Sequence, residues 1–321
     1  MTNVVVTEGV WGAPLEQLSR ELSVHRDADS WQAPDRLAGL LAGAGALIVR
    51  NRTQVTREFL LACGELKVVG RAGVGLDNID VKAADEFGVV VVAPLGANAV
   101  SVAEHSLALA LALVRKLVPL DRASRAGGWD RSPGRELAGR TWGVLGAGAT
   151  GRACARLARA LGMSVVAYDP YLPPDHPELA ELDMPLLGLE EVAASADVIS
   201  CHLPATAETN QLLGASFFSA MRPDALLISV GRGEVVDEEA LYAALFAGGL
   251  GGAGLDVRAS EPPEPGGLEM LDNVVLTPHV AGITAESQLR ILEILADDTR
   301  RVLGGGSATH AVGSCRTARR A

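Results

Sequence analysis

Residues 141–151 read Thr141-Trp142-Gly143-Val144-Leu145-Gly146-Ala147-Gly148-Ala149-Thr150-Gly151, an apolar run that passes directly into a glycine pattern. The run 141–145 predicts a buried strand, and the small-residue run 152–161 that follows predicts a helix. In such a strand–turn–helix, the first two glycines allow a tight turn and close approach to a pyrophosphate. The helix N-terminus offers free N–H groups and its positive dipole end to that anion. The stretch therefore predicts a dinucleotide-binding turn.

An acidic residue follows this turn at a suitable distance. Asp169 ends the next predicted strand, 18 positions after Gly151. A carboxylate there can accept hydrogen bonds from an adenosine ribose and would repel a 2′-phosphate, which favours NAD over NADP. The alternative is a glycine-rich structural turn followed by a helix-capping aspartate. The spacing and the preceding strand favour the dinucleotide.

Outward from this turn, short runs rich in Val and Ile alternate with Ala/Leu-rich periodic segments. This alternation is typical of an α/β protein with parallel sheets covered on both faces. A helix is expected to start near Ser101, because Ser101-Val102-Ala103-Glu104 resembles a capping box. The expected strands are 3–6, 46–50, 66–70, 89–92, 141–145, 164–168, 198–201, 225–230, 252–255 and 274–276, and the expected helices include 101–117, 152–161, 238–247 and 285–303.

Length and composition narrow the class of protein. A chain of 321 residues, 48% of them hydrophobic, is long enough for about two packed domains. The 28 basic and 39 acidic residues give a net charge of −11, which disfavours nucleic-acid and membrane-surface binding. The four cysteines form no CxxC pair, so neither a disulfide framework nor a metal site is indicated. Without a signal-peptide pattern or a membrane-length apolar run, we expect a soluble cytoplasmic protein.

Three polar residues with complementary chemistry follow the turn in the order Arg232, Glu261 and His279. Arg232 and His279 each follow a predicted strand, and open α/β sheets bind ligands at the carboxyl ends of their strands. An arginine can hold a carboxylate and polarise a carbonyl, and a histidine can exchange a hydroxyl proton. A glutamate near that histidine favours the imidazolium. Together the three residues predict hydride transfer on a 2-hydroxy or 2-oxo acid.

Each of the three has a plainer interpretation when it is taken alone. Arg232 could be a surface-loop arginine, and Glu261 could be a solvated loop acid. His279 could satisfy a buried backbone carbonyl. Their joint occurrence downstream of the dinucleotide turn makes the functional interpretation the stronger one.

Further motifs occur in a set order along residues 2–305. This ordered set resembles the D-isomer-specific 2-hydroxyacid dehydrogenase family, and within it the phosphoglycerate dehydrogenases most closely. The motifs are Gly70-Arg71-Ala72-Gly73-Val74-Gly75-Leu76-Asp77-Asn78-Ile79-Asp80, Asn98 with Ser101-Val102-Ala103-Glu104, Gly146 to Gly151, Asp169-Pro170, Cys201-His202-Leu203-Pro204, Arg232-Gly233 with Val235-Val236-Asp237-Glu238, Asp256 to Pro263, and Pro278-His279.

The resemblance implies an architecture of two Rossmann-like or flavodoxin-like parallel-sheet domains with a cleft between them. Residues 1–97 plus 284–321 would form the substrate domain, and residues 98–283 would form the NAD-binding Rossmann domain. Family members usually dimerise through the dinucleotide domain, so a homodimer is expected. The chain is expected to be a short form without the regulatory C-terminal domain of longer phosphoglycerate dehydrogenases.

The resemblance also implies roles for individual residues. Arg232 would hold the carboxylate and carbonyl of the substrate, His279 would be the acid/base, and Glu261 would be its partner. Backbone N–H groups of Gly73, Val74 and Gly75 would bind the carboxylate, with Asn98 nearby. The expected cofactor contacts are Val102, Gly146, Gly148, Ala149, Thr150, Gly151, Asp169, Pro170, His202, Leu203, Pro204, Thr209, Val230, Gly231, Arg232, Asp256, His279 and Gly282.

The substrate is expected to be a small anionic 2-hydroxy or 2-oxo acid. In the phosphoglycerate enzymes, arginines that match Arg50 and Arg71 hold a phosphate, and Arg131 matches a basic loop contributed near a neighbouring subunit. Arginine suits a dianion because its planar guanidinium makes forked hydrogen bonds. The plainer alternative is that Arg50 and Arg71 form local salt bridges.

The dinucleotide turn departs from the family at one position. Ala149 stands where family members usually have a basic residue, so only the backbone would contact the pyrophosphate there.

Other functions remain open at this point. A glyoxylate or hydroxypyruvate reductase, or a dehydrogenase for a phosphonate analogue, would use the same chemistry. An NAD-sensing binding protein that resembles the transcriptional corepressors of this fold would keep the same residues. The absence of a long polar interaction tail disfavours that last class.

Overall fold

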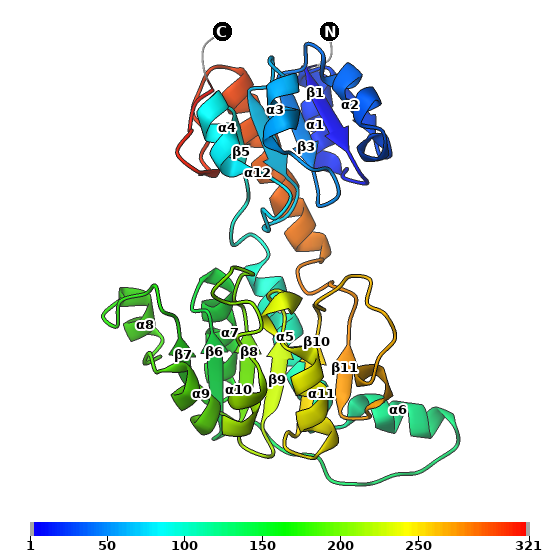
Figure 1. Ribbon diagram of the computed structural model, residues 1–321, viewed down its shortest axis with the longest axis vertical. Helices are drawn as coiled ribbons and strands as arrows, with labels where there is room; N and C mark the ends of the chain where they lie inside the picture. The colour runs from blue at the N-terminus through cyan, green and yellow to red at the C-terminus, as the bar shows by residue number, and fades with distance from the viewer. Residues whose placement is uncertain (1–2, 319–321) are drawn as a thin grey trace. The chain divides into compact units, whose positions relative to one another are not determined.

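The computed structural model describes residues 3–318 of the chain. These fold into two compact units, each of them α/β (Figure 1). Unit 1 comprises the chain up to Asn98 together with the chain from Thr284 onward, and unit 2 comprises Ala99–Ile283. Within residues 3–318, no helix combines the length and the apolar character that a membrane crossing requires.

Unit 2 has a six-stranded, fully parallel sheet in the order β11-β10-β9-β8-β6-β7. Helices cover both of its faces, as the strand–helix alternation predicts. Because all the strands run in one direction, the loops after them emerge at one edge. The strands are β6 (Thr141–Leu145), β7 (Ser164–Tyr168), β8 (Val198–Cys201), β9 (Leu226–Ser229), β10 (Gly252–Leu255) and β11 (Val274–Leu276).

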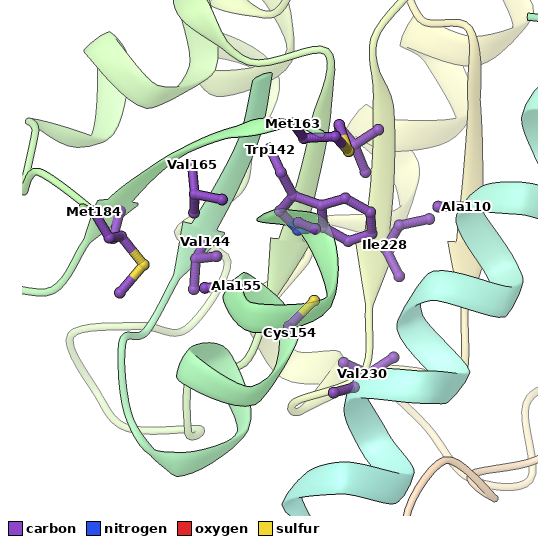
Figure 2. Close-up of a cluster of buried hydrophobic side chains, with 14 of the residues drawn as sticks. Ala110, Trp142, Val144, Cys154, Ala155, Met163, Val165, Met184, Ile228 and Val230 are labelled. Atoms are coloured by element: carbon purple, nitrogen blue, oxygen red, sulfur yellow. The ribbon is translucent and has the colours of Figure 1, made fainter. Parts of the chain in front are cut away.

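The core of unit 2 lies on both faces of this sheet. On one face, α5 (Ala99–Val114) and α7 (Ala149–Ala160) pack around fully buried Trp142, as Figure 2 shows. The indole N–H of Trp142 donates to the Ser200 hydroxyl at 2.8 Å, so this large apolar side chain leaves no polar atom unsatisfied. The other face packs against α9 (Leu189–Ser195), α10 (Ala215–Ala220) and α11 (Glu238–Phe246).

Unit 1 has a six-stranded sheet in the order β12-β5-β4-β3-β1-β2. Its helices α1 (Ala13–Glu21) and α12 (Ala285–Leu303) cover one face, while α2 (Pro34–Leu41), α3 (Arg57–Ala62) and α4 (Val81–Phe87) cover the other. The strands are parallel except for the edge strand β12. They are β1 (Val4–Thr7), β2 (Val24–Asp27), β3 (Ala46–Val49), β4 (Val68–Arg71), β5 (Val90–Val92) and β12 (Ala311–Val312).

The fold class predicted from the sequence is confirmed, and three details differ. The helix predicted to start at Ser101 begins at Ala99 and ends at Val114, so Ser101 lies inside it and a second helix, α6 (Leu117–Arg125), follows. The edge strand β2 was not predicted, because Val24 is its only apolar residue. The two-residue strand β12 is antiparallel, since the chain returns to β5 along the sheet edge.

Candidate active site

The glycine turn connects β6 to α7, as the sequence predicts. Gly146 has φ 91°, in the left-handed region that favours glycine. A Cβ on Gly151 would lie 2.1 Å from the Gly146 carbonyl oxygen, so the helix can approach the turn only with glycine there. A Cβ on Gly148 would meet nothing within 4 Å, and no side chain caps the helix at this residue. The first N–H groups of α7 are therefore accessible to an anion.

Asp169 follows β7 and faces this turn. Its Oδ2 accepts the backbone N–H of Ala147 at 3.0 Å, and its Oδ1 accepts that of Tyr171 at 3.0 Å. Each carboxylate oxygen keeps further acceptor capacity. The carboxylate is thus fixed beside the turn where a dinucleotide ribose would be recognised.

His202 follows β8 at the same edge of the sheet. Ser200 accepts the Trp142 indole N–H, so its single proton can go to His202 Nε2, 2.9 Å away. Desolvation lowers the pKa of His202 to about 4, so the ring is neutral near pH 7. When Ser200 is the donor to Nε2, the ring hydrogen is on Nδ1. That Nδ1 is buried without a hydrogen-bond partner among residues 3–318. A buried donor in this state suits a bound polar group, and the turn residues and Asp169 likewise fit a dinucleotide.

His279 lies in a turn after β11 with φ 54°, an uncommon conformation for a residue with a side chain. Buried Asp256 holds that turn. Its backbone carbonyl accepts the His279 N–H at 2.8 Å, and its carboxylate accepts the N–H groups of Val280 and Ala281 at 2.9 and 2.8 Å. Thr277 donates its hydroxyl to the same carboxylate at 2.5 Å. Asp256 was predicted as a cofactor contact, and its visible contacts are with the histidine turn.

Glu261 and His279 form a close pair. Oε2 of Glu261 lies 2.7 Å from Nδ1 of His279, and Oε1 accepts the backbone N–H of Arg258 at 3.2 Å. The two side chains are about half exposed, at 40% and 47%. A carboxylate on Nδ1 favours the tautomer with its hydrogen there, which leaves Nε2 to exchange a proton with a ligand. The side-chain pairing expected from the sequence is present in the structure.

Arg232 follows β9 through Val230 and Gly231. Its Nη1 donates to the Gly231 carbonyl at 2.9 Å, and a short 3-10 turn, η2 (Gly233–Val235), begins after it. A Cβ on Gly231 would lie 2.6 Å from the Leu203 carbonyl oxygen, so this loop packs directly on the loop after β8. Arg232 thus shares the carboxyl edge of the sheet with the turns that follow β6, β10 and β11.

In unit 1, Arg50 follows β3 in a loop fixed by an unexpected residue. Buried Glu8, with φ 60°, accepts the backbone N–H groups of Arg50 to Thr53 on its carboxylate at 2.8 to 3.2 Å. Burial raises the pKa of Glu8, but these hydrogen bonds outweigh it, so the pKa lies below its ordinary value. Asn78 donates to the carbonyls of Arg50 and Thr53. The guanidinium of Arg50 forms no ion pair with any residue between 3 and 318.

Arg71 ends β4, next to the loop that contains Gly73, Val74 and Gly75. Its side chain packs against that loop, because a Cβ on Gly73 would lie 1.8 Å from Nη1 of Arg71. Nη1 also donates to the Ala72 carbonyl at 3.1 Å. Arg50 and Arg71 therefore stand at the ends of neighbouring parallel strands, beside the predicted carboxylate-binding loop.

The remaining predicted residues are less closely grouped. Val102 is buried in α5, and the Thr209 hydroxyl donates to the Pro204 carbonyl at 2.6 Å, which fixes the loop after β8. Pro170 follows Asp169, Gly282 follows the histidine turn, and Asn98 precedes α5. Arg131 is exposed in the segment between α6 and β6, which approaches the amino ends of the strands. Within unit 2 it stands apart from the candidates in the turns that follow the carboxyl ends of the strands.

Several residues that support this site were not predicted from the sequence. His105 in α5 lies 3.0 Å from the Thr277 hydroxyl, which extends the contacts of Asp256. Arg258 lies between Asp256 and Glu261 and pairs with two glutamates. Glu8 and Asn78 fix the Arg50 loop. All of these are charged or polar residues, and most of their partners lie far away in sequence. Asn78 and Arg258 lie inside the quoted motifs, but the motifs do not indicate their contacts.

Comparison with known proteins gives a family match. Residues 107–281 match the model for the D-isomer specific 2-hydroxyacid dehydrogenase, NAD binding domain. A D-3-phosphoglycerate dehydrogenase of Archaeoglobus fulgidus is 43% identical over 270 residues, covering 83% of this chain and 51% of that relative. An (S)-sulfolactate dehydrogenase of Chromohalobacter salexigens is 40% identical over 307 residues, covering 95% and 99%. The chain spans about half the length of the phosphoglycerate dehydrogenases that it matches.

A solved structure gives the same result for the fold. The D-lactate dehydrogenase from Aquifex aeolicus, complexed with NAD and lactic acid, superposes with a TM-score of 0.82. It is 30% identical and covers 94% of this chain and 96% of its own. The matched residues 107–281 include the glycine turn, and the matched model is that of an NAD-binding domain. The chain belongs to the D-isomer specific 2-hydroxyacid dehydrogenase family.

Proposed function

We propose that this protein is an NAD-dependent oxidoreductase that acts at C2 of a D-2-hydroxy acid. The observation that carries the proposal is the Glu261–His279 pair, with 2.7 Å between Oε2 and Nδ1, at the sheet edge that also presents the glycine turn. Bound NAD would accept the hydride that leaves C2. The chain must then remove the hydroxyl proton and hold the acid in place.

His279 is the proposed acid/base. With Nδ1–H donating to Glu261, Nε2 has a lone pair that takes the hydroxyl proton as the alcohol becomes a ketone. The resulting imidazolium is stabilised by the Glu261 carboxylate. In reduction of the 2-oxo acid the same nitrogen returns the proton, so one residue serves both directions.

Arg232 and unit 1 are the proposed anchors of the carboxylate. The planar guanidinium of Arg232 can bind one carboxylate face and the adjacent oxygen on C2. Backbone N–H groups of Gly73 to Gly75 would bind the same carboxylate, in a loop against which Arg71 packs. This division gives unit 1 the role of substrate domain and unit 2 the role of NAD-binding domain.

The best substrate candidate has a second anionic group on C3, as 3-phosphoglycerate does. Arg50 and Arg71 support this choice, since they end neighbouring strands and bring two guanidinium groups to the edge that has the carboxylate-binding loop. Arg50 has no ion pair within residues 3–318 that would neutralise it. A phosphate dianion is well matched to such a pair.

A sulfonate is the second candidate for that C3 group. The sulfolactate dehydrogenase relative is matched over nearly its whole length, while the phosphoglycerate dehydrogenases are matched over about half of theirs. The (S)-descriptor of sulfolactate denotes the same spatial arrangement as D-3-phosphoglycerate, because the sulfur-bearing carbon outranks the carboxylate in priority. One active-site geometry therefore accommodates either acid.

We further propose a homodimer that uses the segment around α6. In Figure 1, α6 and the chain after it extend beyond the sheet of unit 2. Leu117, Val118 and Trp129 in this segment are 55%, 40% and 87% exposed, which is apolar surface suited to a second copy. Arg131 lies in the same segment, so dimerisation would bring it to the neighbouring subunit.

We also propose a cytoplasmic location. Cys63, Cys154 and Cys201 are buried thiols that form no disulfide. Unpaired cysteines are usual where the surroundings keep thiols reduced.

Turnover assays test the proposed function directly. NAD reduction would be followed with D-3-phosphoglycerate, (S)-sulfolactate and D-lactate, with the opposite enantiomers as controls. We expect the acids with an anionic C3 group to have the highest kcat/KM and the opposite enantiomers to be inactive. NAD binding without turnover of any 2-hydroxy or 2-oxo acid would instead indicate an NAD-sensing binding protein.

A further inference from the structure

Arg258 is a largely buried cation beside the Glu261–His279 pair. Its side chain is 9% exposed, although it lies in a surface loop after β10. Nη2 lies 2.8 Å from Oε2 of Glu238, Nε donates to Oε1 of Glu238 at 3.0 Å, and Nη1 lies 2.6 Å from Oε1 of Glu269. We call Arg258, Glu238 and Glu269 the clamp.

The clamp joins three segments of unit 2. Glu238 is the first residue of α11, and Glu269 lies in η3 (Leu268–Met270). Glu238 also accepts the backbone N–H of Ala259 at 2.8 Å, and Glu269 accepts that of Gly266 at 2.9 Å. The loop that contains Glu261 is thereby fixed near both of its ends.

The backbone of Arg258 contacts the proposed chemical groups on two sides. Its N–H donates to Oε1 of Glu261 at 3.2 Å. The other oxygen of Glu261, Oε2, lies 2.7 Å from Nδ1 of His279. Its carbonyl lies against Gly233, where a Cβ would come within 2.0 Å of the Arg258 carbonyl oxygen. One residue therefore touches both the loop after Arg232 and the carboxylate that holds His279.

The arrangement differs from an ordinary surface ion pair. Arg122 and Asp272 in the same unit lie 3.2 Å apart, but their side chains are 72% and 79% exposed. Exposed pairs of this kind contribute little because water screens them and their side chains stay mobile. Arg258 instead loses most of its water and gains two carboxylates, so its position is closely fixed.

We propose that the clamp is a positioning device that holds Glu261 on Nδ1 of His279 and keeps the Arg232 loop beside them. This inference rests on the proposed function for its catalytic consequence. Arg258, Glu238 and Glu269 are positioning residues, since each acts through Glu261 or the Gly233 backbone. Small displacements of a proton-transfer group lower the rate strongly, so the clamp supports kcat more than cofactor affinity.

The test compares Arg258→Met, Arg258→Lys and Glu269→Gln with wild type. The first readout is the tautomer of the neutral His279 ring, from its 15N shifts, assigned with His279→Gln. The hydrogen is expected on Nδ1 in wild type and to shift toward Nε2 in Arg258→Met and Glu269→Gln, with an intermediate ratio in Arg258→Lys. The second readout is kcat, expected to fall on the order of 10- to 100-fold in Arg258→Met with KM for NAD nearly unchanged.

Arg140→Met is the matched control. Arg140 lies 3.2 Å from Asp197. These two residues precede β6 and β8, so they lie at the amino ends of strands of the unit 2 sheet, away from the proposed chemistry. Both readouts should stay at wild-type values in this variant. A wild-type tautomer ratio in Arg258→Met and Glu269→Gln overturns the inference, as does an equal change in Arg140→Met. The tautomer needs no turnover, so it decides the inference even if no 2-hydroxy acid is a substrate.

Discussion

Nδ1 of His279 lies 2.7 Å from Oε2 of Glu261, although η3 and β11 separate the two residues along the chain. The contact exists because the parallel sheet brings the ends of β10 and β11 to one edge. The carboxylate fixes which ring nitrogen carries the hydrogen and leaves the other to face a ligand.

Glu261→Gln should lower kcat on the order of 10- to 100-fold, because the amide keeps a hydrogen-bond acceptor but loses the charge that stabilises the imidazolium. KM for the hydroxy acid should change little, since Glu261 is not proposed to touch it. Steady-state kinetics over a range of pH check this. An unchanged kcat at every pH would remove Glu261 from the mechanism.

Asp256→Asn should destabilise unit 2 by about 1–3 kcal/mol, because buried N–H groups of the histidine turn lose a charged acceptor. The Val280 and Ala281 amides are the ones affected. Denaturant unfolding and kcat should both respond. Asp272→Asn, at a side chain that is 79% exposed, is the control and should leave both unchanged. Equal effects in the two variants would contradict the role given to Asp256.

Gly151→Ala and Gly148→Ala should have different effects on the stability of the fold and on NAD affinity. Gly151→Ala places a methyl group 2.1 Å from the Gly146 carbonyl oxygen, so it should lower stability as well as NAD affinity. Gly148→Ala meets no protein atom within 4 Å, so it should weaken NAD binding by occupying the approach to the helix N-terminus while the thermal midpoint stays unchanged. Calorimetric titration and melting curves separate the two effects. Full NAD affinity in both variants would place the dinucleotide elsewhere.

Glu8 should give the Arg50 loop a pH-dependent stability. Its folded pKa lies below the ordinary value of 4.5, so its contribution is present above that value and is lost as pH falls through the folded pKa. Glu8→Gln should therefore speed hydrogen exchange of the amides of residues 50–53 near neutral pH. In this variant the protection of these amides should no longer fall as the pH is lowered. Glu16→Gln, at an exposed position, is the control. Wild-type protection in Glu8→Gln would show that other contacts fix the loop.

Arg50→Gln should change substrate preference and spare the chemistry. If Arg50 binds a C3 anion, kcat/KM for D-3-phosphoglycerate or (S)-sulfolactate should fall about 10- to 100-fold, the worth of one hydrogen bond to a charged group. D-lactate has no such group, so its kcat/KM should stay the same. An equal loss for all three acids would mean that Arg50 supports the loop and does not select the substrate.

The sequence was most informative where local pattern and topology agree. The glycine turn, the bounds of β6 and the order Arg232, Glu261, His279 could be read directly, because strand–helix alternation determines where loops emerge. It was less informative where an element depends on tertiary contacts. The chain segment with β12 is fixed by Asp298, which accepts the N–H groups of Thr309 and His310.

Charged residues that support the site were the hardest to predict. Arg258 and Glu238 are 20 positions apart, and Glu8 and Arg50 are 42 apart. Nothing in the local pattern separates such residues from solvated ones, since only the fold buries them. Asp256 was predicted from its motif, but its hydrogen bonds to the histidine turn became visible only in three dimensions.

In the proposed reaction His279 exchanges the hydroxyl proton and Arg232 holds the carboxylate while a hydride passes between C2 of the D-2-hydroxy acid and NAD. Single-turnover reduction of NAD by D-3-phosphoglycerate and by (S)-sulfolactate, in wild type, His279→Gln and Arg232→Gln, tests it most directly. We expect rapid NAD reduction in wild type with at least one acid, and a loss on the order of 100-fold or more in His279→Gln. In Arg232→Gln the concentration of acid that gives half the maximal rate should be higher. Wild-type rates in His279→Gln, or no reduction with any 2-hydroxy acid, would contradict it.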